Sequence, residues 1–153
     1  MKKKAKITGI EYGKKFESGP YFGPGENIGI LLDSSVHKED IQRGSVLAAV
    51  GTVQEYTEFD AVVYMLSEEE CKGNQRQLFT DLNLQFYFRT VYVDGRISCA
   101  GVIEPNSHGE IHVILKQPHS LEQHMRFAIC NNSSSSSSKM IGAGCITGLG
   151  TKE

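Results

Sequence analysis

The chain has 153 residues, of which 39% are hydrophobic and 16 are glycines, and its formal net charge is −2. This size and composition predict one ordinary folded domain with part of a second, and they exclude a disordered chain. The charge excludes a basic field over the whole chain, so any contact with nucleic acid must come from a local patch. The basic start MKKKAKITGI has no apolar run after it, which predicts neither a secretory signal nor a membrane span.

Short runs of alternating apolar and polar residues, separated by Gly, Pro, Asn and Asp, extend along most of the chain. Such runs predict β-strands at a spacing typical of a barrel or sandwich. One helix-like segment, HKEDIQRG, interrupts them early and ends at Gly44. In chain order the predicted strands are NIGILL, FDAVVYML, LQFYFRTVYVDGRI, IHVIL, RFAIC and MIGAGCITGL.

The predicted strand LQFYFRTVYVDGRI is the most aromatic of these runs. Alternation assigns its phenylalanines to a buried face, and Gln85, Tyr87 and Arg89 to the opposite face. Composition leaves open whether this second face is only solvated or binds a partner.

Two polar segments are predicted loops. SEEECKGNQRQ (67–77) is long and charged, and NNSSSSSSK (131–139) is a low-complexity serine tract between two strands, expected to be a mobile hairpin loop. A seam between two sets of strands is expected at AVGTVQEYT.

Common catalytic and metal-binding motifs are absent from the sequence. There is no Gly-x-x-x-x-Gly-Lys-Ser/Thr phosphate loop and no Gly-x-Ser-x-Gly elbow. The four cysteines include no Cys-x-x-Cys pair, which favours reduced, packed thiols over a zinc site or a disulfide framework. His108 and His112 share a face of a predicted strand, but no further ligands stand at fixed positions, which favours solvent-facing histidines.

Several strings occur in order along the chain, and they carry a resemblance to a known family. They are GENIGILL, HKEDIQRGSVLA, TEFDAVVYMLS, LQFYFRTVYVDG, LEQHMRFAI and IGAG. From about residue 5 to residue 148 the chain resembles elongation factor Tu, a bacterial and organellar translation factor. The resemblance implies an all-β fold. Residues 54–153 would form an antiparallel β-barrel like the third domain of that family, and residues 1–53 part of its second β-barrel.

The family uses GTP to control delivery of aminoacyl-tRNA to the ribosome. Its GTPase domain has no counterpart among these strings, so the resemblance implies a chain that is not an enzyme by itself and holds no cofactor. GTP and magnesium would belong to the missing domain. The implied partners are aminoacyl-tRNA, a GTPase domain, an exchange factor or the ribosome, and no membrane. The implied location is the cytoplasm or the mitochondrial matrix, and reduced cysteines agree with both.

The resemblance also implies binding residues. Asn27 corresponds to the asparagine that lines the pocket for the amino acid esterified to the tRNA, and Gln85 to a contact with the tRNA T-stem. The other stem positions depart from the family pattern. They are Asn74 where the family has Arg, with Arg76 two residues on; Asn83 for another Arg; Asp94 for Thr; and Gln117 for a Lys of some members.

These departures remove cations from a surface that must meet phosphates, and they add the carboxylate of Asp94. We therefore expect weakened binding to tRNA, with Lys72, Arg76 and Lys139 as compensating cations. Three interpretations stay open: an elongation factor Tu-like protein or fragment that contributes to aminoacyl-tRNA binding and delivery; a protein–protein interaction module that no longer binds tRNA; and a non-functional truncated product.

The resemblance of the first residues to only part of a barrel also leads to an expectation about their stability. Half a barrel leaves edge strands with unpaired backbone groups. Residues 1–50 are therefore expected either to add to the following barrel as an irregular flap or to pair with another chain.

Overall fold

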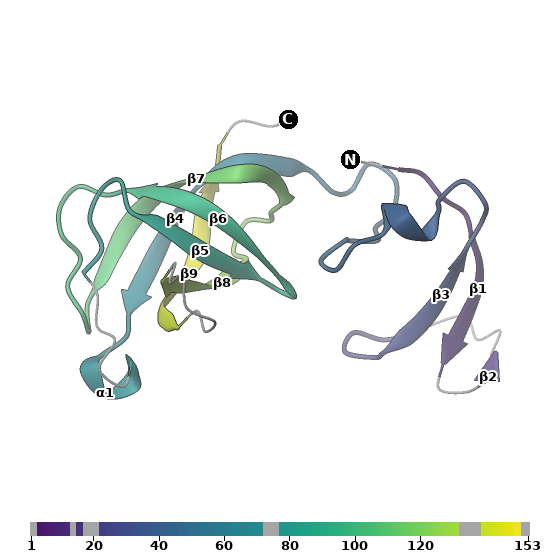
Figure 1. Cartoon of the computed structure of the whole chain (residues 1–153), viewed down its shortest axis with the longest axis horizontal. Coiled ribbons are helices and arrows are strands. Elements are labelled where there is room, and N and C mark those ends of the chain that lie inside the picture. Colours follow the sequence, from purple (N-terminus) through teal and green to yellow (C-terminus); the bar gives the residue numbers. More distant parts are fainter. Residues whose placement is uncertain (1–2, 13–14, 17–21, 72–76, 132–138, 151–153) are drawn as a thin grey trace. The chain divides into compact units, whose positions relative to one another are not determined.

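The computed structural model describes residues 3–12, 15–16, 22–71, 77–131 and 139–150. The chain divides into two compact units, Met1–Ser45 and Val46–Glu153 (Figure 1). Each unit has its own sheet. Within the described residues, no helix has the length and apolar character needed to cross a membrane.

The first unit is a small antiparallel sheet with the strand order β2-β1-β3. Its strands are β1 (Ile7–Tyr12), β2 (Lys15–Phe16) and β3 (Ile28–Leu32), and a short 3-10 helix, η1 (Lys38–Asp40), follows them. The predicted strand NIGILL is confirmed as β3, and HKEDIQRG forms one turn of helix. The Asp40 carboxylate accepts a hydrogen bond from the His37 backbone N–H at 3.0 Å, which holds the start of this turn.

Among the described residues, β1, β2 and β3 form a regular antiparallel sheet in which β1 is hydrogen-bonded to both of its neighbours. Addition of this segment to the barrel and its pairing with another chain both stay predictions.

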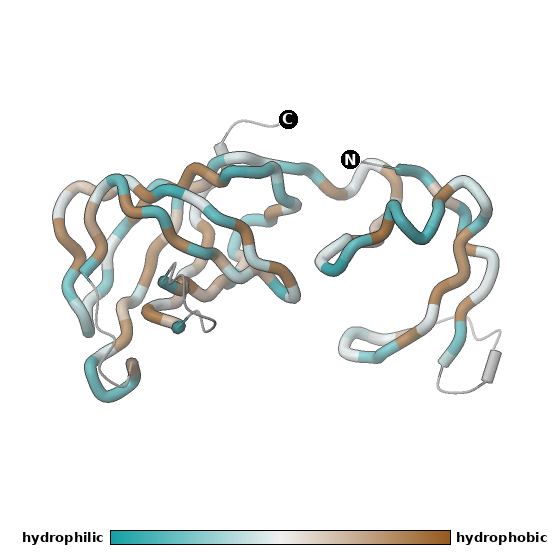
Figure 2. The backbone as a smooth tube through the Cα atoms, viewed as in Figure 1, coloured by the Kyte–Doolittle hydropathy of each residue, from teal (hydrophilic) through white to brown (hydrophobic). Residues whose placement is uncertain are grey.

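The second unit is a closed antiparallel barrel with the strand order β4-β7-β6-β5-β8-β9, which confirms the predicted all-β barrel. Its members in chain order are β4 (Glu55–Met65), β5 (Asn83–Phe88), β6 (Val91–Ser98), β7 (His108–Ser120), β8 (Arg126–Asn131) and β9 (Met140–Leu149). Figure 2 shows hydrophobic and hydrophilic residues alternating along these strands. Closure places one side of that alternation inside and the other in solvent.

Four phenylalanines form the centre of the barrel. The Phe59 ring lies 6.0 Å from Phe86, 5.8 Å from Phe88 and 5.4 Å from Phe127, all edge to face. Phe59 and Phe86 have no exposed surface. Burial of such a side chain contributes about 1.5–3 kcal/mol, and edge-to-face contacts add to it. The buried phenylalanine face predicted for LQFYFRTVYVDGRI is confirmed.

The glycine Gly144, in the IGAG string, lets β9 approach this aromatic centre. A Cβ at this position would lie 2.5 Å from the Phe127 ring and 2.9 Å from a Val63 methyl group. Any larger residue would displace one of the two.

The prediction that LQFYFRTVYVDGRI forms a single strand is wrong. The segment is a hairpin: Phe88 at the end of β5 faces Val91 at the start of β6, and Arg89 and Thr90 form the turn, with Arg89 at φ 50°. No Gly, Asn or Pro marks this turn in the sequence. The Arg89 guanidinium donates to the Glu122 carboxylate at 2.8 Å, a contact distant in sequence that fixes the turn residue.

The predicted polar loop 67–77 contains a short helix that alternation does not reveal, α1 (Glu68–Cys71). The Ser67 hydroxyl accepts a hydrogen bond from the Glu70 backbone N–H at 3.3 Å, as at a helix start. Residues 72–76 of that loop and 132–138 of the serine tract lie outside the described residues.

Candidate nucleic-acid interface

The outer wall of β5, β6 and β7 brings several predicted tRNA-stem residues together. Gln85 on β5 lies directly opposite Asp94 on β6. The Asp94 Oδ2 atom lies 3.4 Å from Nζ of Lys116 on β7. Gln117 follows Lys116 and is exposed. We call Gln85, Asp94 and Lys116 the polar row.

The neighbouring residues explain why the polar row faces outward. Leu84 and Phe86 flank Gln85 in sequence and are buried in the core, so alternation turns Gln85 to the other face. Gly95 follows Asp94, and a Cβ there would lie 3.0 Å from the Ile114 carbonyl oxygen and 3.1 Å from the Phe86 ring. The missing side chain lets β6 lie close to both β7 and the core, which places Asp94 beside Lys116.

The polar row carries a nearly compensated charge. The Asp94 side chain is 32% exposed and the Lys116 side chain is 59% exposed, so their ion pair is a partly solvated one, worth about 0–1 kcal/mol. The second carboxylate oxygen, Asp94 Oδ1, is buried and accepts no hydrogen bond from the described residues. Lys116 reduces the repulsion that Asp94 presents to a phosphate, but the same pairing holds Lys116 back from that phosphate.

Other barrel cations are engaged in the same way. Arg89 pairs with Glu122 at 2.8 Å, and Arg96 lies 3.7 Å from Asp81. Arg96 is directly opposite Asn83, so a cation still lies near the position where Asn83 replaces an arginine of the family. A phosphate that binds to these side chains must compete with the carboxylates they already face.

The remaining predicted residues fall elsewhere. Asn27 belongs to the first unit, where it is exposed immediately before β3. Asn74 and Arg76 lie outside the described residues, as does Lys72. Lys139 is described and exposed, just before β9.

Sequence reasoning missed Lys116 as a member of this surface. The alternation in IHVIL, continued by one residue, places Lys116 on the same outer face as Ile114. Its partner Asp94 is 22 residues away and on another strand. The ion pair becomes visible only when β6 and β7 are paired.

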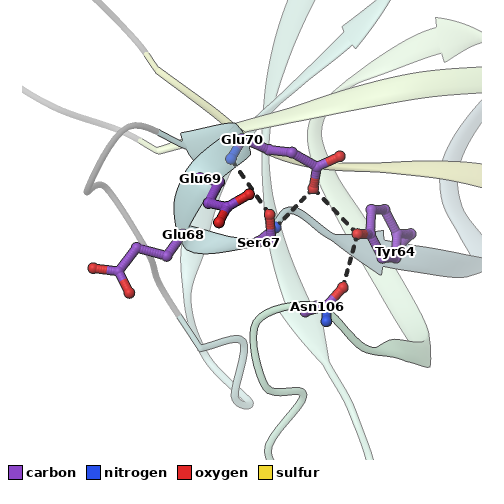
Figure 3. Close-up of a pocket in the computed structure, with 6 residues that line it drawn as sticks. All are labelled: Tyr64, Ser67, Glu68, Glu69, Glu70 and Asn106. Carbon is purple, nitrogen blue, oxygen red and sulfur yellow. Dashed lines mark hydrogen bonds between the residues drawn. The ribbon is translucent and has the colours of Figure 1, made fainter.

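A separate hollow of about 740 Å³ lies beside α1 and has an acidic lining (Figure 3). The Tyr64 hydroxyl donates to the Glu70 carboxylate at 3.1 Å, and that carboxylate also accepts from the Ser67 backbone N–H at 2.8 Å. The Ser67 hydrogen bond, followed by that of Tyr64, lowers the pKa of Glu70. An ionised lining of this kind repels phosphate, which sets the hollow apart from the polar row.

Comparison with known protein families agrees with the barrel. Residues 52–149 match the family described as Elongation factor Tu C-terminal domain. The matched segment contains every strand from β4 to β9, and therefore the closed barrel and the polar row on its wall.

Proposed function

The chain belongs to the elongation factor Tu C-terminal domain family, and we propose that its barrel binds the stem of aminoacyl-tRNA through the polar row. Family membership makes the barrel a translation elongation factor-like domain. One observation carries the finer proposal. Gln85 and Asp94, which the resemblance assigns to the tRNA stem, lie directly opposite each other on one outer wall, with Lys116 beside them. Contacts to phosphate and sugar position such proteins without reading base sequence.

The proposed binding is weak and only moderately sensitive to salt. Each lysine or arginine that neutralises a phosphate releases counterions. It makes the slope of log affinity against log salt more negative by about 0.7–0.9. Lys116, Arg89 and Arg96 each face a carboxylate and must exchange it for a phosphate. Few net contacts therefore form.

In this proposal the chain contributes binding and no chemistry. GTP hydrolysis, with its GTP and magnesium, belongs to a GTPase domain that acts together with the barrel. The ribosome and an exchange factor are the further partners that the translation role suggests.

The test uses the full chain and fluorescently labelled aminoacyl-tRNA, with anisotropy measured from 50 to 200 mM salt. Asp94→Thr is expected to tighten binding about fivefold, because it removes a repulsive carboxylate worth ~1 kcal/mol and frees Lys116. The same variant should steepen the salt slope by about 0.7–0.9, one phosphate contact.

Glu110→Thr is the matched control. Glu110 is an exposed carboxylate on β7, six residues from Lys116 and so about 20 Å along the strand. Glu110→Thr changes the net charge by the same amount as Asp94→Thr, but Glu110 lies outside the polar row. If both variants bind tRNA more tightly by the same factor, the effect of Asp94→Thr comes from net charge alone. If the unmodified chain does not bind at 50 mM salt, the proposed function is contradicted.

A second function, contact with another protein chain, is favoured by the first unit. No described side chain among residues 3–45 is buried, and Ile7, Tyr12 and Leu31 are 45%, 46% and 49% exposed. An open sheet with so much exposed apolar surface is typical of a segment that is covered in an assembly. Light scattering of the purified chain across concentrations tests this; a monomer at all concentrations would remove self-association as the covering contact.

A further inference from the structure

Two exposed tyrosines stand on the outer wall of the β5–β6 hairpin, beside the polar row. Tyr87 on β5 and Tyr92 on β6 are directly opposite each other, and their rings lie 5.6 Å apart at 40°. They are 36% and 55% exposed. We call them the tyrosine pair.

The tyrosine pair shares its face with the polar row. Tyr87 is two residues from Gln85 along β5, and Tyr92 is two residues from Asp94 along β6, about 7 Å in each strand. On the other side, Tyr87 is opposite Ala128 of β8, which is in turn opposite Ala143 of β9. These short side chains leave the tyrosines standing above their neighbours and reachable by a large ligand.

We propose that the tyrosine pair extends the polar row into a neutral hydrogen-bonding strip for the ribose–phosphate backbone of duplex RNA. A phenol both donates and accepts a hydrogen bond. Tyrosine and glutamine are among the side chains that bond to phosphate and sugar, and duplex RNA is recognised mainly through its 2′-hydroxyls and phosphates. This inference rests on the proposed function and names the residues that supply contacts without charge.

The geometry favours backbone contacts over stacking on a base. Each tyrosine ring already packs against the other, so part of each ring face is occupied. A splayed base needs a free ring face, whereas the hydroxyl at the ring edge needs only solvent access. Because Gln85, Tyr87 and Tyr92 are uncharged and Asp94 is paired with Lys116, these contacts add affinity without releasing counterions.

The experiment compares the full chain with its Tyr87→Phe, Tyr92→Phe and double variants, using a labelled RNA hairpin with a duplex stem and, separately, a single-stranded RNA of the same length. Each substitution removes one hydroxyl and keeps the ring. We expect binding to the hairpin to weaken about three- to tenfold per hydroxyl, with the salt slope unchanged. Tyr64→Phe is the matched control, because the Tyr64 hydroxyl also belongs to the barrel but lies in the acidic hollow beside α1, apart from the polar row.

The outcomes separate this inference from the proposed function. If the unmodified chain binds no RNA at low salt, both are overturned. If it binds the hairpin but the phenylalanine variants bind equally well, the inference alone is overturned. Tighter binding to single-stranded RNA, lost in Tyr87→Ala and Tyr92→Ala but kept in the phenylalanine variants, would assign the rings to base stacking and also overturn it. Circular dichroism spectra of all variants exclude misfolding as the cause.

Discussion

The barrel and the three-stranded sheet share the same alternating pattern of apolar residues, but only the barrel buries the apolar face of its strands. In β4, Phe59, Ala61 and Val63 are 0–1% exposed, whereas on the apolar face of β3 Ile30 is 38% exposed and its two neighbours, Ile28 and Leu32, are half-buried. Barrel closure gives each strand a neighbour on both sides and encloses the inward side chains. The open sheet leaves its edge strands β2 and β3 with one neighbour each. Alternation therefore predicts strands, while closure decides where the stability lies.

This difference predicts two very different responses to the same kind of mutation, and the largest effect is expected in the core. Phe59→Ala should lower the free energy of unfolding of the barrel by about 3–5 kcal/mol, because it removes the ring that contacts three other phenylalanines. Ile30→Ala in the first sheet should cost under about 1 kcal/mol, because little burial is lost. Urea denaturation followed by circular dichroism measures both. Equal effects would show that the first sheet is as well covered in solution as the barrel core.

A second comparison uses glycines. Gly144→Ala should destabilise the barrel by about 1–3 kcal/mol, since its new Cβ overlaps the Phe127 ring. Gly23→Ala in the first unit is the control, because a Cβ there meets nothing within 4 Å. The same denaturation experiment applies. A harmless Gly144→Ala would mean that β9 moves away from the core at little cost.

Several features of the barrel were predictable from local patterns. The buried faces of β4 and β5 follow directly from the alternation around Phe59 and Phe86, because a strand repeats every two residues whatever its partner. The family resemblance added the closed barrel, which alternation does not distinguish from a sandwich. It also pointed to Gln85 and Asp94 before their strands were paired.

What escaped prediction depends on contacts between distant residues. The turn at Arg89 has none of the usual turn residues, and its position is held by Glu122, 33 residues away. Lys116 lies at the candidate interface because the pairing of β6 with β7 brings it beside Asp94. In both cases the sequence near the residue does not reveal its partner, since the fold brings that partner from a distant part of the chain.

The smallest expected difference between the two units lies in their pH dependence. In the barrel, His119 stacks on Phe88 with ring centroids 5.4 Å apart, and desolvation, followed by the charge of Arg89, lowers its pKa below 6.5 against a weaker opposing effect of Glu55. The unfolded chain then binds a proton more readily than the folded one. The contribution of His119 to stability is full above pH 6.5 and is lost as the pH falls through the lowered pKa.

In the first unit the lowered pKa values belong to carboxylates. Hydrogen bonds from Ser35 and Lys3 lower the pKa values of Asp33 and Asp40, respectively, below 3.8, so their contribution is lost only in stronger acid. Thermal melts of the barrel should therefore shift downward between pH 7 and pH 5, and His119→Phe should flatten that shift by keeping the ring stack without a titrating group. A shift that persists in His119→Phe would assign the titration to another barrel group.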